Sequence, residues 1–487
     1  MDLKYKLMIF SLVLVLCMSV TVAAEVTEDT TNDISIENNN YEIATSYDNI
    51  NDDKNIEENT RSVNPITTDV VIDSSYDNQV FDVSSNVRIT SGVAQSNNIA
   101  FNLNGDNITI DGLNIVNDET QPIAINALSN SNHITIINTN ITVVNTEETE
   151  TMGIILNNTQ NSLVENCNVN ISAVPQDLYT PPDWAYALKT SGILTDGGNN
   201  ITINANTVNI CNSTNNGTSS GTGEAITVRN NANNVNVINN IVTGEGFPYV
   251  YGINTYGVSN LVIIENNTVN LTSGNYICGI QLTSTSNSIL RRNTITGTCF
   301  AESGQCTGYE AFAYGIVLSS SYKPTASEST NNLIEFNDID LSANVTYGIE
   351  LNIADSTQVF NNTVDVDGEV VMALGMYNSS YCQIKDNNFT VTGATRELHP
   401  WTYEAIPPET TGIKIVSDGN KTSDYNIITG NRVIVNDSNN TNIYDIILLN
   451  TNNTIVTYNY LKYVIGSGFR ILDNGYNSVL SPNYWLL

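Results

Sequence analysis

Short segments in which apolar and polar residues alternate run from about residue 63 to the end of the chain. Alternation with a period of two is typical of strands that bury one face, and no stretch shows the spacing of an amphipathic helix. Asn, Ser, Thr and Gly separate the segments, and these residues favour turns. The pattern therefore predicts an all-β chain made of many short strands and many turns.

One sequence frame repeats along this region. An apolar or aromatic residue stands shortly before an Asn, and apolar residues follow two and four places later; Asn337, Asn362 and Asn387 stand 25 residues apart in this frame. Wider spacings elsewhere indicate insertions into the same unit. The frame fits twelve positions, three of them without Asn: Leu113, Thr139, Cys167, Asn206, Asn239, Asn267, Asn293, Asn337, Asn362, Asn387, Asn431 and Asn459.

A second frame, Tyr-Gly-Ile or a variant of it, precedes many of these positions, as at Tyr314-Gly315-Ile316 and Tyr347-Gly348-Ile349. A unit this short cannot bury its own apolar face, so units must stack and share an interior. Coils of three strands satisfy this if each strand pairs in parallel with its equivalent, with right-handed crossovers. We predict a single right-handed parallel β-helix of about twelve coils over residues 63–487.

The nine asparagines of the first frame have a structural interpretation. At a turn between two strands, an inward amide can bond backbone groups that the bend leaves unpaired. It can also stack on the equivalent amide of the next coil. We therefore predict a ladder of buried amides through Asn206, Asn239, Asn267, Asn293, Asn337, Asn362, Asn387, Asn431 and Asn459.

The first residues suggest export. Lys4 and Lys6 precede an apolar run that ends in small residues at Ala23-Ala24, so residues 1–24 read as a signal peptide. Residues 25–62 are polar, acidic and without period, which predicts a disordered spacer. No later segment has a long apolar run, so we expect no membrane span in the mature chain. The predicted location is secreted, extracellular or at the cell surface.

The charge and the cysteine content limit the kinds of partner, disulfide and metal site that we expect. Lys plus Arg number 17 and Asp plus Glu number 50, for a formal charge of −33. This balance disfavours nucleic acid and anionic membranes as partners. Cys299 and Cys306 are the best candidates for a local disulfide. No Cys or His pattern indicates a metal site. We expect no cofactor. The segment Asp365-Val366-Asp367-Gly368-Glu369 resembles half of a calcium-binding loop, so calcium is kept as an alternative.

The repeated frames resemble the parallel β-helix repeats of the pectate-lyase-like superfamily. The Asn-rich, acidic and exported character is similar to that of adhesin-like surface proteins of methanogenic archaea. This resemblance covers residues 65 to 480. It implies a protein of the cell envelope that mediates attachment, and it implies that any enzyme of this fold works in a groove flanked by long loops.

Three long insertions, residues 172–186, 296–314 and 393–411, precede Gly-Ile strands or their equivalents. Equivalent positions stack, so the insertions should emerge on one side and form an aromatic and acidic face. Aromatic rings and carboxylates of this kind bind sugars. The candidates for binding a polysaccharide or cell-surface glycan are Tyr179, Trp184, Tyr186, Phe247, Tyr249, Tyr309, Trp401, Tyr403, Asp183, Glu310 and Glu404.

Two alternatives stay open. The aromatics could pack the loops onto the rod, which would make the protein a spacer without a ligand. The same face could belong to a polysaccharide lyase or glycoside hydrolase, which needs two carboxylates at a defined separation. Catalytic residues cannot be assigned, because the motifs of polygalacturonases and pectate lyases are absent. His133 and His399 are interpreted as packed or solvated side chains.

Overall fold

The computed structural model describes residues 63–129, 131–174, 190–213, 221–257, 259–300, 311–319, 328–394, 409–417, 421–436, 442–464 and 469–485. The predicted signal peptide and the predicted acidic spacer lie outside these ranges. The first described residue, Val63, opens strand β1. The part of the chain that the structure describes contains strands, turns and one 3₁₀ turn, η1 (Ser74–Tyr76), and no α-helix.

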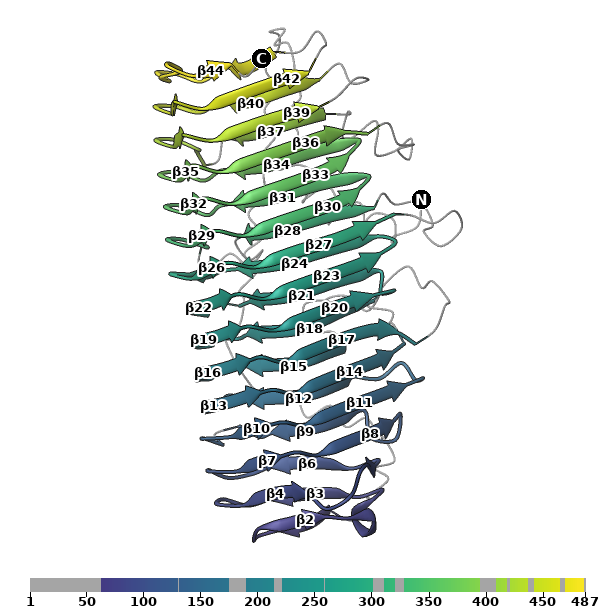
Figure 1. Cartoon of the computed structure of the whole chain (residues 1–487). Helices are drawn as coiled ribbons and strands as arrows, with labels where there is room; N and C mark the ends of the chain where they lie inside the picture. The colour runs from purple at the N-terminus through teal and green to yellow at the C-terminus, as the bar shows by residue number, and fades with distance from the viewer. Residues whose placement is uncertain are drawn as a thin grey trace, which may run out of the picture.

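Three parallel sheets, A, B and C, wind along one rod (Figure 1). Between the two ends of the rod, each coil runs from sheet A to sheet B to sheet C, and the pairings between coils are parallel. The coil of β31, β32 and β33, for example, pairs with that of β34, β35 and β36. The chain is therefore a right-handed parallel β-helix, as the repeats predicted.

The strands of each sheet follow in chain order. Sheet A contains β1 (Val63–Ile66), β3 (Val80–Val83), β6 (Ala100–Leu103), β9 (Ile123–Ala127), β12 (Thr151–Asn157), β15 (Thr190–Asp196), β18 (Thr222–Arg229), β21 (Tyr249–Tyr256), β24 (Tyr276–Thr283), β28 (Phe312–Ser319), β31 (Val345–Asn352), β34 (Val370–Tyr377), β37 (Glu409–Val416), β40 (Ile443–Leu449) and β43 (Phe469–Asp473). Sheet B contains β2 (Val70–Ile72), β4 (Arg88–Ser91), β7 (Thr109–Asp111), β10 (Thr135–Ile137), β13 (Gln160–Glu165), β16 (Asn199–Asn204), β19 (Asn233–Ile238), β22 (Ser259–Glu265), β25 (Thr285–Ser286), β26 (Ile289–Arg291), β29 (Leu333–Glu335), β32 (Gln358–Phe360), β35 (Gln383–Lys385), β38 (Ile427–Thr429) and β41 (Ile455–Thr457). Sheet C contains β5 (Ser96–Asn97), β8 (Asn114–Asp118), β11 (Asn140–Asn145), β14 (Asn168–Ala173), β17 (Thr207–Asn212), β20 (Ile241–Glu245), β23 (Thr268–Ser273), β27 (Thr294–Cys299), β30 (Asp338–Ala343), β33 (Thr363–Gly368), β36 (Asn388–Gly393), β39 (Arg432–Asn436), β42 (Tyr460–Val464) and β44 (Tyr484–Trp485).

Sheet A has 15 strands, three more than the twelve turns that the sequence frame marks. The extra coils lie at the two ends of the rod. The first coils, before Leu113, turn without the repeated Asn, and the last turn uses Asn483, which lies beyond the twelve predicted positions. The frame therefore found the regular centre of the rod and missed its ends.

Apolar residues that point inward stack from coil to coil and form one continuous core. Ile316 is fully buried and pairs with Ile280 on one side and with Ile349 on the other. Burying one such side chain contributes roughly 1.5–3 kcal/mol. Because every coil supplies equivalent residues, the core has the length of the rod and depends on the register between coils.

Turns between strands place many asparagines in the left-handed region of backbone conformation. Asn200 (φ 57°) and Asn234 (φ 52°) hold equivalent turns, and the Asn234 amide donates a 3.2 Å hydrogen bond to Asn200 Oδ1. Asparagine tolerates this conformation better than other residues with a Cβ atom. His133 (φ 54°) occupies such a turn before β10. This requirement explains much of the asparagine content.

Buried amides form a continuous ladder between sheets B and C. Asn362 is representative: its Oδ1 accepts from the backbone N–H of Asn337 at 2.9 Å, and its Nδ2 donates to the Ile334 carbonyl at 2.9 Å and to Asn387 Oδ1 at 3.0 Å. The same pattern links Asn206, Asn240, Asn267, Asn293, Asn337, Asn362, Asn387, Asn431, Asn459 and Asn483.

The predicted ladder is wrong at one position. Asn239 is exposed, adopts φ 58° and donates to the side chain of Asn204 at 2.8 Å. Its neighbour Asn240 is the buried member, and its amide bonds Asn267 at 3.0 Å. The two residues are adjacent and identical in type, so the sequence frame could not separate the left-handed turn residue from the inward one.

Candidate functional site

The three long insertions predicted to form the binding face join sheet C to sheet A. They run from β14 to β15, from β27 to β28 and from β36 to β37, so their ends lie along one edge of the rod. Most residues of these connections lie outside the described ranges. That holds for the predicted glycan-binding residues Tyr179, Asp183, Trp184, Tyr186, Tyr309, Glu310, Trp401, Tyr403 and Glu404, and for His399. Their role stays a prediction.

Two of the predicted glycan-binding aromatic residues, Phe247 and Tyr249, lie in the described ranges, and they differ in burial. Phe247 is fully buried in the core, and its ring fills the space beside Gly223, where a Cβ atom would stand 2.6 Å from ring carbon Cδ2. It cannot contact a ligand, so the prediction for Phe247 is wrong. Tyr249 lies at the start of β21 on the outer face of sheet A, is partly exposed, and approaches the ring of Tyr276 at 5.7 Å.

Tyr249 belongs to a larger cluster of aromatic residues on the outer face of sheet A. Neighbouring rings approach at 5.5 Å (Tyr251 and Tyr276), 5.3 Å (Tyr276 and Tyr314) and 5.1 Å (Tyr314 and Tyr347), and the last pair is stacked. Apolar residues of the same face pack around the rings. We call this surface the tyrosine face; its members are Tyr249, Tyr251, Tyr276, Cys278, Phe312, Tyr314, Val317, Val345, Tyr347, Val370, Met372 and Tyr377.

Three of these tyrosines, Tyr251, Tyr314 and Tyr347, belong to the Tyr-Gly-Ile frame, but the frame alone does not assign them a role. Glycine and isoleucine of the frame face the core, as Gly315 and Ile316 do, whereas Tyr314 faces outward. Two inward residues in succession break the alternation along these strands. Strict alternation from the buried isoleucine would place the tyrosine inward. Its outward direction follows only once the glycine is known to face the core as well.

The tyrosine face has a buried centre and a partly exposed margin. Tyr314 and Tyr347 are each 5% exposed and Tyr377 is 3% exposed, whereas Tyr249, Tyr251 and Tyr276 retain more exposure. In the centre, the Tyr377 hydroxyl donates to Met372 Sδ at 3.6 Å. Burial raises the pKa of the Tyr276, Tyr347 and Tyr377 hydroxyls, which therefore stay protonated. Hydroxyl donors and ring faces thus lie together.

Charged residues flank this surface on sheet A. Arg229 donates to Asp196 Oδ2 at 2.6 Å, and Lys414 donates to Glu409 Oε2 at 2.8 Å. Glu224, 1% exposed, accepts from the Thr227 hydroxyl at 2.7 Å and from the Asn254 amide at 3.2 Å. The face therefore combines rings, hydroxyls, amides and carboxylates.

Glu350 stands on the outer side of β31, within the same face. Its neighbour in the pairing of β31 with β34 is Gly375, and the ring of Tyr377 lies close to that glycine. Burial raises the pKa of Glu350 to about 7, because few groups there replace the water that a charged carboxylate needs. The side chain is therefore a carboxyl that exchanges its proton near neutral pH.

This carboxyl predicts a pH-dependent stability. The native state keeps the proton of Glu350 up to pH about 7, whereas an unfolded chain loses it near 4.5, the ordinary pKa of a glutamate side chain. The unfolded state therefore binds fewer protons between these values, and stability falls as pH rises from 4.5 to 7. The contribution is on the order of 3 kcal/mol. Denaturant unfolding at pH 4.5 and 7.5 should show that Glu350→Gln loses less free energy of unfolding over this interval than the parent chain does.

Asp445 sets a necessary control for that measurement. It is fully buried in β40, and burial raises its pKa to about 7 as well, with Arg470 acting in the opposite direction. Asp445→Asn should therefore remove a separate share of the same pH dependence, and the double variant should remove both. An unchanged pH profile in Glu350→Gln would contradict the assignment of Glu350.

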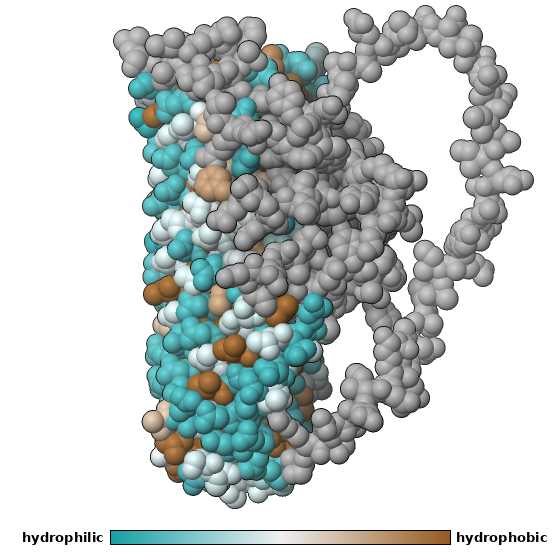
Figure 2. All heavy atoms as spheres, turned by 90° about the vertical axis from the view of Figure 1, so that its right-hand side faces the viewer, coloured by the Kyte–Doolittle hydropathy of each residue, from teal (hydrophilic) through white to brown (hydrophobic). Residues whose placement is uncertain are grey.

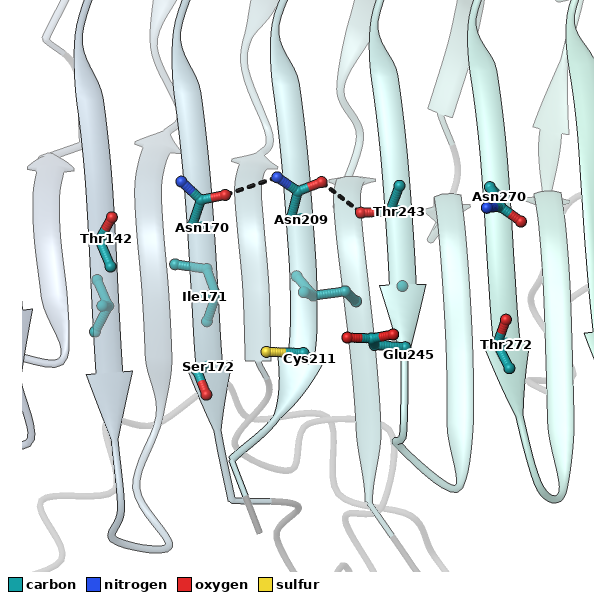
Figure 3. Close-up of a pocket in the computed structure, with 13 residues that line it drawn as sticks. Thr142, Asn170, Ile171, Ser172, Asn209, Cys211, Thr243, Glu245, Asn270 and Thr272 are labelled. Atoms are coloured by element: carbon teal, nitrogen blue, oxygen red, sulfur yellow. Dashed lines mark hydrogen bonds between the residues drawn. The ribbon is translucent and has the colours of Figure 1, made fainter. Parts of the chain in front are cut away.

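A groove of about 410 Å³ lies on the outer face of sheet C (Figure 3). Strands β11, β14, β17, β20 and β23 form it, and short polar side chains line it. Asn209 donates to Asn170 Oδ1 at 2.6 Å and accepts from the Thr243 hydroxyl. The lining holds one carboxylate, Glu245, and no aromatic side chain. This groove offers hydrogen bonds but no ring on which a sugar could stack.

The segment considered for calcium is part of a strand. Asp365, Asp367 and Gly368 belong to β33, and Asp365 pairs with Asp340 of β30. Burial, followed by the neighbouring carboxylates of Asp340 and Asp367, raises the pKa of Asp365. Among the described residues, no group of three or more acidic, His or Cys side chains is arranged to hold a metal ion.

The predicted disulfide falls partly outside the described residues. Cys299 ends β27 and is fully buried, whereas Cys306 lies in a range that the structure does not describe. Their pairing stays a prediction.

The described surface is largely hydrophilic. Figure 2 shows hydrophobic residues on it as separate spots rather than as a continuous band. Two exposed tyrosines, Tyr381 (60% exposed) and Tyr425 (51%), stack on each other at 5.3 Å at turns beside sheet B. Within the described ranges, no helix has the length and apolar character that a membrane crossing requires.

Comparison with known proteins finds no matching family model and no matching curated protein. Solved structures that share the architecture include the periplasmic alginate epimerase AlgG, with 13% identity, 86% of this chain and 78% of that chain covered, and a TM-score of 0.40. The A-module of the Azotobacter vinelandii mannuronan C-5 epimerase AlgE4 has 12% identity, coverages of 78% and 91%, and a TM-score of 0.44. A mutant tailspike of E. coli bacteriophage HK620, in complex with a hexasaccharide, is also among them, with 10% identity, coverages of 80% and 69%, and a TM-score of 0.39. Likeness at this level carries no argument about function.

Proposed function

We propose that the chain is a secreted, adhesin-like protein of the cell envelope that binds a glycan through the tyrosine face. The observation that supports this most is the run of tyrosine rings in contact along β21, β24, β28 and β31. The export prediction from residues 1–24 is consistent with an envelope protein.

The chemistry of this face suits a sugar chain. Aromatic rings pack against the apolar faces of sugar rings, while placed amides, hydroxyls and carboxylates bond the sugar hydroxyls. Tyr251 and Tyr276 supply partly exposed rings, and Gln281 of β24 and Glu350 of β31 supply polar groups on the same sheet. Repetition from coil to coil gives the face the extended form that a polymer requires.

A glycan array followed by titration calorimetry tests the proposal. Tyr251→Ala and Tyr276→Ala should each weaken the selected glycan at least about tenfold, because aromatic anchors carry a large share of binding energy. Tyr381→Ala is the matched control: it removes an exposed ring beside sheet B and should leave the affinity unchanged. Equal affinity in the tyrosine-face variants, or a loss in the control, would place binding elsewhere.

A polysaccharide lyase or glycoside hydrolase is the second candidate, and Glu350 favours it. A carboxyl whose pKa lies near 7 can serve as a general acid. Incubation with the bound glycan, followed by analysis of new chain ends, separates the candidates. New ends that disappear in Glu350→Gln would indicate an enzyme, whereas binding without new ends would indicate an adhesin.

A further inference from the structure

We infer that Asn361, at an exposed bend between sheets B and C, carries an N-linked glycan whose first sugar packs on the ring of Phe336. The inference assigns a covalent modification to an edge of the rod that does not border sheet A or the tyrosine face. It rests on the export that the proposed function includes, because N-linked glycans are attached to exported chains.

The bend presents a complete acceptor sequence, Asn361-Asn362-Thr363, on the surface. Asn361 is exposed and adopts φ 54°, and Thr363, also exposed, begins β33. The asparagine between them points inward: Asn362 is 1% exposed, and its Nδ2 donates to Asn387 Oδ1 at 3.0 Å. The amide and the hydroxyl that a transferase must reach are therefore both accessible, while the middle residue holds the bend.

A sugar on Asn361 would leave the bonds of the bend intact. The backbone N–H of Asn361 donates to the Lys385 carbonyl at 3.2 Å, and Asn362 supplies the ladder bonds to the neighbouring coils. The side chain of Asn361 makes no hydrogen bond with the described residues. Attachment of a sugar replaces one of its two amide hydrogens and so displaces no partner inside the protein.

Phe336 gives the second, independent observation. It holds the position of Asn361 in the preceding coil, since Asp338, two residues later, pairs with Thr363. Its side chain is 49% exposed, and its φ is 56°. A bulky residue in the left-handed region is an outlier, and such outliers gather at functional positions.

The geometry places this ring beside the acceptor amide. Equivalent positions of adjacent coils stand about 4.8 Å apart, and both side chains are exposed at the same bend. Aromatic rings pack against the apolar face of a sugar. A first sugar on Asn361 would therefore cover Phe336, whose ring otherwise stands in water.

A second acceptor sequence, Asn266-Asn267-Thr268, lies three coils earlier at the equivalent bend. Asn266 is exposed and adopts φ 56°, and its Nδ2 uses one hydrogen in a 2.7 Å bond to Asn239 Oδ1. The adjacent coils place Asn239 and Arg292 beside it, both at positive φ, and neither is aromatic. This site can carry a glycan but lacks the ring, so it is the matched comparison.

Attachment joins Nδ2 of Asn361 to the anomeric carbon of an oligosaccharide that is linked through phosphate to a lipid. The bond from that carbon to the phosphate oxygen breaks, and the lipid phosphate leaves with the electron pair. Nδ2 gives up one proton to a base of the transferase. The lipid-linked donor and the transferase are supplied by the exporting cell.

Glycopeptide mass spectrometry tests the site on the full chain, secreted by a eukaryotic host that attaches N-linked glycans. We expect a glycan on Asn361 and on Asn266 in most molecules, and none on Asn378, whose acceptor sequence is complete but whose side chain is 3% exposed. Thr363→Val should remove the first glycan and leave the second. An unmodified Asn361 in the secreted chain would overturn the inference and leave binding by the tyrosine face untouched. Retention of the chain inside the cell would contradict export, and the inference would fail with it.

The contact with Phe336 is tested on the secreted chain after an endoglycosidase has trimmed each glycan to its first sugar. Phe336→Ala should lower the unfolding temperature by roughly 1–3 °C more in the parent than in the Thr363→Val background, because only the parent has a sugar on Asn361. With Thr268→Val in place of Thr363→Val, the extra loss should persist. The same chains produced without glycosylation should show additive effects. Additive effects of Phe336→Ala and Thr363→Val in the secreted chain would show that the sugar does not touch the ring and would overturn the inference.

Discussion

Replacing Asn362 by Leu should lower the free energy of unfolding by about 2–6 kcal/mol. Leu has the same number and branching of side-chain heavy atoms as Asn, but it leaves the buried backbone N–H of Asn337 without its acceptor and the Ile334 carbonyl without its donor. Each buried polar group left unpaired costs about 1–3 kcal/mol. Denaturant unfolding, followed by circular dichroism in the β region, measures the change.

The neighbouring residue gives the control for this substitution. Asn361 is exposed and adopts φ 54°, a conformation that glycine adopts freely. Asn361→Gly should therefore change stability by less than about 1 kcal/mol. Equal losses in the two variants would show that turn conformation, rather than the amide ladder, carries the stability of this bend.

Replacing Gly315 by Val should destabilise the rod by about 1–3 kcal/mol, although Val is the better strand former. A Cβ atom at Gly315 points into the core, where it would meet the Gly348 carbonyl of the next coil and stand 2.7 Å from Ile339 Cγ2. Relief of this overlap requires the two coils to separate, which weakens their pairing. Thermal unfolding of the purified chain measures the loss.

The sign of this effect distinguishes two explanations. Strand propensity alone would make Gly315→Val more stable than the parent, whereas steric overlap makes it less stable. The stability of Gly315→Ala should fall between that of the parent and that of Gly315→Val, since Ala225 and Ala373 occupy equivalent inward positions in their own coils. A stabilised Val variant would mean that the coils have room that the described geometry does not show.

The fold was predictable because its signals repeat. A buried position that recurs in every coil leaves many copies of the same pattern, and errors at one copy do not change the architecture. The register error between Asn239 and Asn240 illustrates the limit: both residues are asparagine, and only the direction of the side chain separates a left-handed turn from a ladder position. Adjacent asparagines at Asn361 and Asn362 carry the same ambiguity.

The candidate site was less predictable because it does not repeat in the same way. Phe247 is expected at the surface because it lies in one of the shorter loops, yet its ring fills the space beside Gly223 in the core. Tyr276 and Tyr347 lie 71 positions apart in sequence and come into one cluster only through the pairing of β24, β28 and β31. A pattern search along the chain sees each tyrosine alone, so the cluster emerges only when the coils are stacked.

The uniform coil also lets this molecule change length in discrete steps. The stretch from Asn337 to the residue before Asn362 is one complete turn of the winding without insertion. Omitting it would join two equivalent bends and shorten the rod by one strand spacing, about 4.8 Å, while every remaining neighbour keeps a partner of the same kind. The length of the rod is therefore a quantity that duplication or loss of a single module can adjust without redesigning the interior.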